Sequence, residues 1–162
     1  MKLYVYDHCP FCVRARMIFG LKNLPVELVV LANDDEATPI GLVGKKVVPI
    51  LVKEEGTAMP ESLDIVHYVD EHFGEKILSE HVRPEIEAWL KEVGSYYGHL
   101  TTARFTQIGL AEFETQSAVD YFTKKKTEFI GDFAENIAKT ETYLARLKGD
   151  LEKLAVLIQS EN

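Results

Sequence analysis

The first stretch of the chain, MKLYVYDHCPFCVRARMIFGL (residues 1–21), contains both of its cysteines and decides the fold. Residues 2–6 form a short β-rich run, which predicts a strand. Pro10 follows where the first turn of a helix tolerates proline, and apolar side chains recur at helical spacing over residues 10–22. The pair Cys9 and Cys12 is therefore expected between a strand and the helix that follows it.

Strands and helices continue to alternate after this helix. The further expected elements are a strand over residues 25–31 (PVELVVL), a short helix from Asn33 or Asp34 to Leu42, strands over residues 47–52 (VVPILV) and up to Met59, and a helix that opens at Ser62. The predicted order is βαβαββα, which is an α/β domain over residues 1–73.

The second half of the chain has no strand signal. Apolar residues follow one another at helical steps from Ile86 to Leu100, and helical periodicity continues to the C-terminus. We expect a linker over residues 74–83 and an all-helical domain over residues 84–162.

The last helical segment has a repeating apolar pattern, called here the seam. The seam consists of Ile137, Leu144, Leu151 and Ile158, seven residues apart, with Leu147 and Leu154 between them. This a/d pattern is usually one wall of a helical bundle, and it can also pair two copies of a chain. Thr140 stands at the first d-type position and Gly149 is expected to interrupt the helix, and both disfavour a coiled-coil dimer. We therefore expect a monomer. Any dimer would form through the surface of residues 137–158.

Composition limits the classes of function. The chain has 162 residues and a formal net charge of −8, which argues against binding of nucleic acid, and the run Lys124 to Lys126 is expected on a solvated face. One closely spaced cysteine pair favours a reducing compartment over a secreted disulfide scaffold. Because the sequence lacks the apolar core of a signal peptide and any membrane span, we expect a cytoplasmic protein with no membrane partner.

The cysteine pair could be a metal site, a structural disulfide or a reactive dithiol. A zinc site needs about four ligands, and no second cysteine pair or His-x-x-x-His follows, so no metal is expected. A disulfide across so short a loop removes little entropy from the unfolded chain. A reactive dithiol between the first strand and first helix of a βαβ unit is the placement of a thioredoxin-like redox motif.

Helix geometry assigns different roles to the two cysteines. Cys9 would lie at the helix N-terminus, where backbone N–H groups and the helix dipole favour a thiolate and should lower its pKa. Cys12, one turn further, should be more buried and less acidic. Cys9 is thus the expected nucleophile and Cys12 the resolving thiol.

Three motifs in order, CPFC, Val48-Pro49 and Pro60-Glu61-Ser62, resemble those of the glutaredoxins. With MKLYVYDHCPFC, RARMIFGLKN, ESLDIVHYVD and the helical second half, the chain resembles more specifically the bacterial glutaredoxin 2 family. The resemblance implies a thioredoxin-like N-terminal domain and an all-α, glutathione-transferase-like C-terminal domain. Chains of that family continue past Asn162, and a helical domain that is incomplete relative to them would leave the seam as an exposed apolar patch.

The resemblance also implies a glutathione site. Pro49 would be a cis proline that turns the backbone of Val48 toward the dithiol, where it would pair with the cysteinyl part of glutathione. Glu61 and Ser62 would hold the γ-glutamyl end at a helix N-terminus. The expected glutathione-binding set is completed by Cys9, Pro10 and Phe11.

The implied activity is glutathione-dependent reduction of protein-glutathione mixed disulfides and protein disulfides by the Cys9/Cys12 dithiol, a form of electron transport. Glutathione is the expected reductant, and glutathionylated or disulfide-containing proteins are the expected partners. A glutathione transferase has no use for Cys12, and a regulatory module of this fold typically loses its cysteine, so both alternatives are disfavoured.

The neighbours of the dithiol allow more than one reading. Tyr6 either shapes the thiol pocket or packs at a strand end, and Arg14 and Arg16 are either thiolate or glutathione contacts or plain surface charge. We expect His8 to face away or into solvent. The aromatic side chains of the second half, Trp89, Tyr96 and Tyr97, are expected in the bundle core or between the domains.

Overall fold

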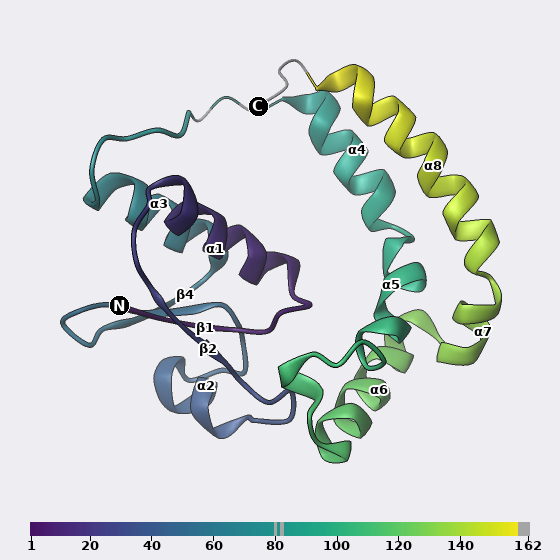
Figure 1. Ribbon diagram of the computed structural model, residues 1–162, viewed down its shortest axis with the longest axis horizontal. Coiled ribbons are helices and arrows are strands. Elements are labelled where there is room, and N and C mark those ends of the chain that lie inside the picture. Colours follow the sequence, from purple (N-terminus) through teal and green to yellow (C-terminus); the bar gives the residue numbers. More distant parts are fainter. Residues whose placement is uncertain (80, 82, 159–162) are drawn as a thin grey trace. The chain divides into compact units, whose positions relative to one another are not determined.

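The computed structural model describes residues 1–79, 81 and 83–158, so residues 80, 82 and 159–162 of the expected linker and helical domain lie outside this part. The elements in chain order are β1 (Lys2–Val5), α1 (Pro10–Leu21), β2 (Glu27–Val30), α2 (Ala37–Val43), β3 (Ile50–Val52), β4 (Ala58–Pro60), α3 (Ser62–His72), α4 (Pro84–Gly94), α5 (Tyr97–Phe105), the 3₁₀-helix η1 (Ala111–Phe113), α6 (Gln116–Ile130), α7 (Phe133–Ala138) and α8 (Thr140–Leu157) (Figure 1). The predicted order of strands and helices is confirmed.

The N-terminal unit is built on a sheet with the strand order β2-β1-β3-β4. Strand β1 pairs parallel with β2 and antiparallel with β3, and β3 pairs antiparallel with β4. Helices α1 and α3 lie together on one face of the sheet, and α2 lies on the other (Figure 1). Apolar side chains of the sheet and of helices α1 and α3 form the core, which contains Leu3, Val5, Leu51, Ile18, Phe19, Ile65 and Val69. Cys9 and Cys12 belong to the same core, so packing fixes the start of α1.

A buried carboxylate fixes the segment that follows α3. Asp70 accepts hydrogen bonds from the backbone N–H groups of Ile77 (3.0 Å) and Leu78 (3.1 Å), and Lys22 lies 2.7 Å from its Oδ1 atom. Burial alone would raise the pKa of Asp70, but these three donors outweigh it and lower the pKa to about 2. Asp70 is therefore ionised at neutral pH and joins the ends of α1 and α3 to the chain beyond them.

Part of the second half of the sequence belongs to the N-terminal unit. Two compact units are present, of which the first comprises Met1–Ser79 and Gly109–Phe122. The backbone N–H of Asn33 donates to the carbonyl of Glu112 (2.9 Å), and the Ser117 hydroxyl donates to the Asp34 carboxylate (2.6 Å). The helix η1 is thus attached to the loop after β2, a grouping that no periodicity in the sequence indicates.

The second unit is helical, and two of the aromatic residues expected in the bundle core or between the domains form hydrogen bonds within it. Trp89 on α4 donates from Nε1 to the Asp150 carbonyl, and the Tyr96 hydroxyl donates to the Asp150 carboxylate (2.8 Å). Tyr96 is buried, with 3% of its surface exposed. Trp89 thus joins α4 to α8, and Tyr96, the N-cap residue of α5, joins the turn after α4 to α8.

Two expectations for the helical unit are wrong. The helical run predicted from residue 86 to 100 is two helices, because α4 ends at Gly94 and α5 begins at Tyr97. The Ser95 hydroxyl there donates to the Glu92 carbonyl (2.6 Å), a local bond that competes with helix continuation. Gly149 does not interrupt its helix, since α8 runs through it; a helical glycine costs only about 1 kcal/mol.

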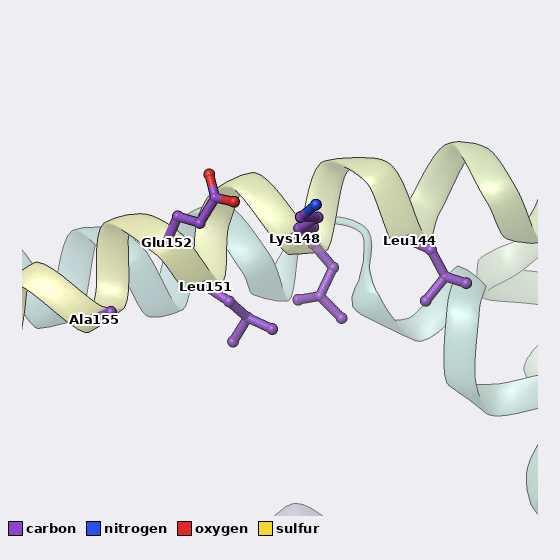
Figure 2. Close-up of a pocket in the computed structure, with 6 residues that line it drawn as sticks. Leu144, Lys148, Leu151, Glu152 and Ala155 are labelled. Carbon is purple, nitrogen blue, oxygen red and sulfur yellow. The ribbon is translucent and has the colours of Figure 1, made fainter.

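The seam is divided between two helices. Ile137 belongs to α7, whereas Leu144 and Leu151 belong to α8. The side chains of Leu144 and Leu151 lie on one side of α8, with the Glu152 carboxylate on the other (Figure 2). The surface groove there is lined by Leu144, Leu147, Lys148, Leu151, Glu152 and Ala155. Leu144 and Leu151 are 44% and 48% exposed, so the apolar patch expected on the seam is present.

No helix in the described part of the chain is long and apolar enough to cross a membrane.

Candidate active site

The two cysteines lie where the sheet delivers the chain to α1. Strand β1 ends at Val5, a short turn follows, and Cys9 is the N-cap residue of α1 with extended backbone angles. Pro10 is the first helical residue. A backbone N–H at this position would have no partner within the helix, and proline has no N–H that could be left unsatisfied. Cys9 is 8% exposed and Cys12 is fully buried, both as free thiols.

Hydrogen bonds at the helix N-terminus stabilise the thiolate of Cys9. The Cys12 thiol donates to Cys9 and is the largest cause of a pKa of Cys9 lowered to about 6. Burial opposes this shift, while the backbone N–H groups of Cys12 and Phe11 and the charge of His8 add to it. At neutral pH Cys9 is therefore mostly thiolate, which is the reactive form of a cysteine.

The same hydrogen bond acts on Cys12 in the opposite direction. Donating to Cys9 and being buried both raise the pKa of Cys12 far above that of an ordinary thiol. The backbone N–H of Tyr6 lies 3.5 Å from its sulfur and lowers the pKa only in part. The pair thus holds one reactive thiolate and one protonated thiol.

The second predicted motif lies against the core that contains the cysteines. The Val48-Pro49 peptide bond is cis, as the resemblance implies, and Pro49 is buried just before β3. Val48 packs against the core cluster that contains Cys9 and Cys12, and so does Tyr6. Burial, followed by the charge of Tyr121, raises the pKa of Tyr6, so this phenol stays protonated.

The third motif forms the start of α3. Glu61 is its N-cap residue at φ 72° and ψ 114°, a region that residues other than glycine rarely occupy and that costs about 1–3 kcal/mol. Ser62, the first residue of the helix, is 7% exposed. Glu61 is exposed and lies 2.8 Å from the Lys45 ammonium, a partner that the sequence did not indicate.

Arginine side chains on α1 divide between two roles. The Arg14 guanidinium lies 3.4 Å from the Ser62 hydroxyl and 5.5 Å from the Phe11 ring centre, so it connects the first and third motifs. Phe11 itself is 54% exposed beside the dithiol. Arg16 instead pairs with Asp7 at 2.9 Å, which makes it a structural surface charge.

The expectation that His8 faces solvent is wrong. Its side chain is 11% exposed, stacks on the rings of Tyr6 and Phe113, and meets Phe122 edge-on. Its Nδ1 lies 2.7 Å from Oε1 of Glu112, which also accepts the His8 backbone N–H at 3.0 Å. Glu112 was not identified from the sequence, where it is one of 26 acidic residues with no motif around it.

The described residues contain no cluster of three or more histidine, cysteine or acidic side chains that could hold a metal ion. The distinctive feature of the site is a buried dithiol in which the pKa of Cys9 is lowered and that of Cys12 is raised, at the start of the first helix of a βαβ unit. This fold and site define a thiol-disulfide oxidoreductase.

Comparisons with known proteins identify the family. Residues 3–77 match the family model "Glutathione S-transferase, N-terminal domain", and residues 85–162 match "Glutaredoxin 2, C terminal domain". Glutaredoxin 2 of Escherichia coli strain K12 is 49% identical over 162 residues, which are 100% of this chain and 75% of that protein. The chain belongs to the glutaredoxin 2 family, and its function is that of a glutathione-dependent thiol-disulfide oxidoreductase.

Solved structures agree with this assignment. Glutaredoxin 2 from Salmonella typhimurium, in complex with glutathione, has a TM-score of 0.96 and 49% identity, over 99% of this chain and 74% of that one. The glutathione transferase GSTFuA3 from Phanerochaete chrysosporium has a TM-score of 0.65 at 14% identity, over 94% of this chain and 72% of that one, which shows likeness of fold alone. The predicted thioredoxin-like domain followed by a glutathione-transferase-like helical domain is confirmed.

Proposed function

We propose that Cys9 is the nucleophile and Cys12 the resolving thiol of this oxidoreductase. The Cys9 thiolate attacks the glutathione sulfur of a protein-glutathione mixed disulfide, and the protein sulfur leaves as a thiolate that takes up a proton. A second glutathione thiolate then attacks the glutathione sulfur bound to Cys9. Glutathione disulfide leaves, and the Cys9 thiolate is restored.

The dithiol route follows from the hydrogen bond between the cysteines. When Cys9 is part of a mixed disulfide with a protein, it no longer accepts a hydrogen bond as a thiolate. The largest cause of the raised pKa of Cys12 is then gone, so Cys12 can lose its proton and attack the Cys9 sulfur. The substrate leaves as a thiol, and glutathione reduces the Cys9-Cys12 disulfide in two steps.

We place glutathione across the three motifs. The backbone of Val48, next to the buried ring of Pro49 and just before β3, offers main-chain groups to the cysteinyl part, as a short added strand would. The N-terminus of α3 at Ser62, with Arg14 beside it, suits a carboxylate, and Glu61 suits an ammonium group. Pro10 and the exposed Phe11 ring border the sulfur of Cys9 from α1.

Support for the γ-glutamyl end comes from two features of Glu61. Its rare backbone angles are of the kind that collect at ligand-binding positions. Its ion pair with Lys45 is exposed on both sides and is worth about 0–1 kcal/mol, so a ligand amine can replace Lys45 at little cost.

We further propose that the partners are glutathionylated and disulfide-containing proteins, and that the compartment is the cytoplasm. A dithiol that must be returned to its reduced form after each cycle requires a reducing, glutathione-rich environment. The proposed chemistry needs one copy of the chain, because its residues all belong to the N-terminal unit. We therefore propose a working monomer, with the seam as the surface of any dimer.

We also propose the boundaries of the domains along the sequence. Residues 1–73 are the redox domain, residues 74–83 the linker and residues 84–162 the helical domain.

The observation that carries the proposal is the placement of two free thiols at the start of α1, with Cys9 as the N-cap residue and Cys12 fully buried one turn further. The test is reduction of the mixed disulfide of glutathione and β-hydroxyethanethiol, coupled to NADPH and glutathione reductase. Wild type and Cys12→Ser should turn over, and Cys9→Ser should be inactive. Activity of folded Cys9→Ser equal to wild type would rule out Cys9 as the nucleophile.

A further inference from the structure

The turn between β1 and α1, which ends at Cys9, is held by Glu112 from the second half of the sequence. Oε1 of Glu112 accepts both the backbone N–H (3.0 Å) and the ring Nδ1 (2.7 Å) of His8, the residue directly before Cys9. An ionised carboxylate can only accept, so Nδ1 of His8 must carry a hydrogen. One oxygen thus fixes both the main chain and the ring of His8.

Glu112 is itself held firmly in place. Its side chain is fully buried, and its carbonyl accepts the Asn33 N–H at 2.9 Å. The neighbouring Phe113 packs edge-to-face on Phe122 and stacks on the His8 ring. Helix η1 is therefore a fixed support from which the carboxylate reaches the turn at residues 6–9.

The carboxylate is costly for the fold, which argues for a role beyond packing. Among the described residues, its second oxygen, Oε2, is buried without a hydrogen-bond partner. Leaving a charged oxygen unsatisfied is unfavourable, and an apolar side chain of similar size is often at least as stabilising as a buried ion pair. Burial alone would raise the pKa of Glu112, but the hydrogen bonds from the side chain and backbone of His8 outweigh it and keep the pKa below its usual value.

We propose that Glu112 is a positioning residue for Cys9, which acts through His8 by fixing the turn before α1 and by holding the His8 ring beside the thiolate. The proposal rests on the assignment of Cys9 as the nucleophile. Two consequences follow for Cys9. The fixed turn keeps its sulfur in line with the N–H groups of Phe11 and Cys12, and the His8 ring, whose effect also lowers the pKa of Cys9, is held in place.

Two other titratable groups around this turn, Asp35 and Tyr121, are unchanged by the test, whereas Glu112 has a second effect that the test does change. Asp35 and Tyr121 act on Tyr6, and Glu112 acts directly on Cys12 by raising its pKa. Glu112→Gln removes that last effect as well, which favours the Cys12 thiolate and leaves the support of Cys9 through His8 as the quantity to measure.

The experiment measures alkylation of Cys9 by iodoacetamide in the reduced protein, with the modified cysteine identified by mass spectrometry. Each protein's rate at pH 6 is divided by its own rate at pH 9, where Cys9 is fully ionised, so changes of accessibility cancel. Because Glu112→Gln releases the turn that aligns the N–H donors on Cys9, we expect the pKa of Cys9 to rise from about 6 by about one unit, which lowers this ratio about fivefold. Glu114→Gln, an exposed carboxylate on the same segment, should leave the ratio unchanged.

A second variant keeps the test decisive. His8→Asn removes the ring at the other end of the hydrogen bond and should also lower the ratio. The double variant should lower it no further than the larger single effect. Circular dichroism establishes that each variant is folded; if Glu112→Gln does not fold, His8→Asn alone decides. A wild-type ratio in folded Glu112→Gln, or in His8→Asn, overturns the proposal, as do additive effects in the double variant. Because iodoacetamide needs no glutathione, failure of the proposed function would appear separately, as absent turnover with an intact alkylation profile.

Discussion

The hydrogen bond from Cys12 to Cys9 makes a quantitative prediction for Cys12→Ala. This bond is the largest cause of the lowered pKa of Cys9, and hydrogen bonds to charged groups are worth about 1.5–3 kcal/mol. One pKa unit corresponds to about 1.4 kcal/mol, so its loss should raise the pKa of Cys9 by about one to two units. From a starting value of about 6, the new value lies between about 7 and 8, still below that of a free thiol because the backbone N–H groups remain.

The assay is a pH titration of the ultraviolet absorbance of the thiolate. At pH 6 the thiolate fraction of Cys9 should fall from about one half to between about one tenth and one hundredth. Cys12→Ser is the matched control, because its hydroxyl remains a donor at the same position; its pKa shift should be smaller than that of Cys12→Ala. A pKa of Cys9 that stays at about 6 in Cys12→Ala would refute the role given to this bond.

Three further predictions concern residues outside the dithiol. Because the pKa of Asp70 is lowered to about 2, below its unfolded value of about 3.9, it contributes stability that is present above about pH 4 and lost as pH falls toward 2. Asp70→Asn should therefore lower the urea midpoint at pH 7 and lose less stability on acidification, and identical pH profiles would contradict this. Leu51→Ala, in the core cluster that also contains Cys9 and Cys12, should lower the free energy of unfolding in urea by about 2–5 kcal/mol. A loss under about 1 kcal/mol would show that the neighbouring side chains close the cavity. Leu151→Lys, at a half-exposed groove position, should change stability by less than about 0.5 kcal/mol and reduce any self-association seen in sedimentation, whereas large destabilisation would show that this face is packed.

Local patterns were sufficient for the order of elements in the N-terminal unit. Proline at the first helical position, apolar spacing on α1 and β-rich runs determine their elements by short-range sterics and burial, and these act within a few residues. The boundaries were less accurate. Strand β3 begins at Ile50, not at residue 47, because Pro49 has no N–H to donate to a strand ladder.

Contacts between distant residues were beyond the reach of the sequence patterns. His8 and Glu112 are separated by 104 positions, and the grouping of Gly109–Phe122 with the N-terminal unit depends on side chains that follow no period. Lys45 was missed for the same reason, since its partner Glu61 belongs to a different element. The motifs located the dithiol, but not the residues that support it.

Covalent capture of glutathione tests the central claim most directly. Cys12→Ser and Cys9→Ser are each incubated with glutathione disulfide and analysed by mass spectrometry of intact protein and of peptides. With Cys9 as the nucleophile, Cys12→Ser gains the mass of one glutathionyl group on the peptide that contains Cys9, and Cys9→Ser gains none. A glutathionyl group on Cys12 in Cys9→Ser, with an unmodified Cys9 in Cys12→Ser, would contradict the account.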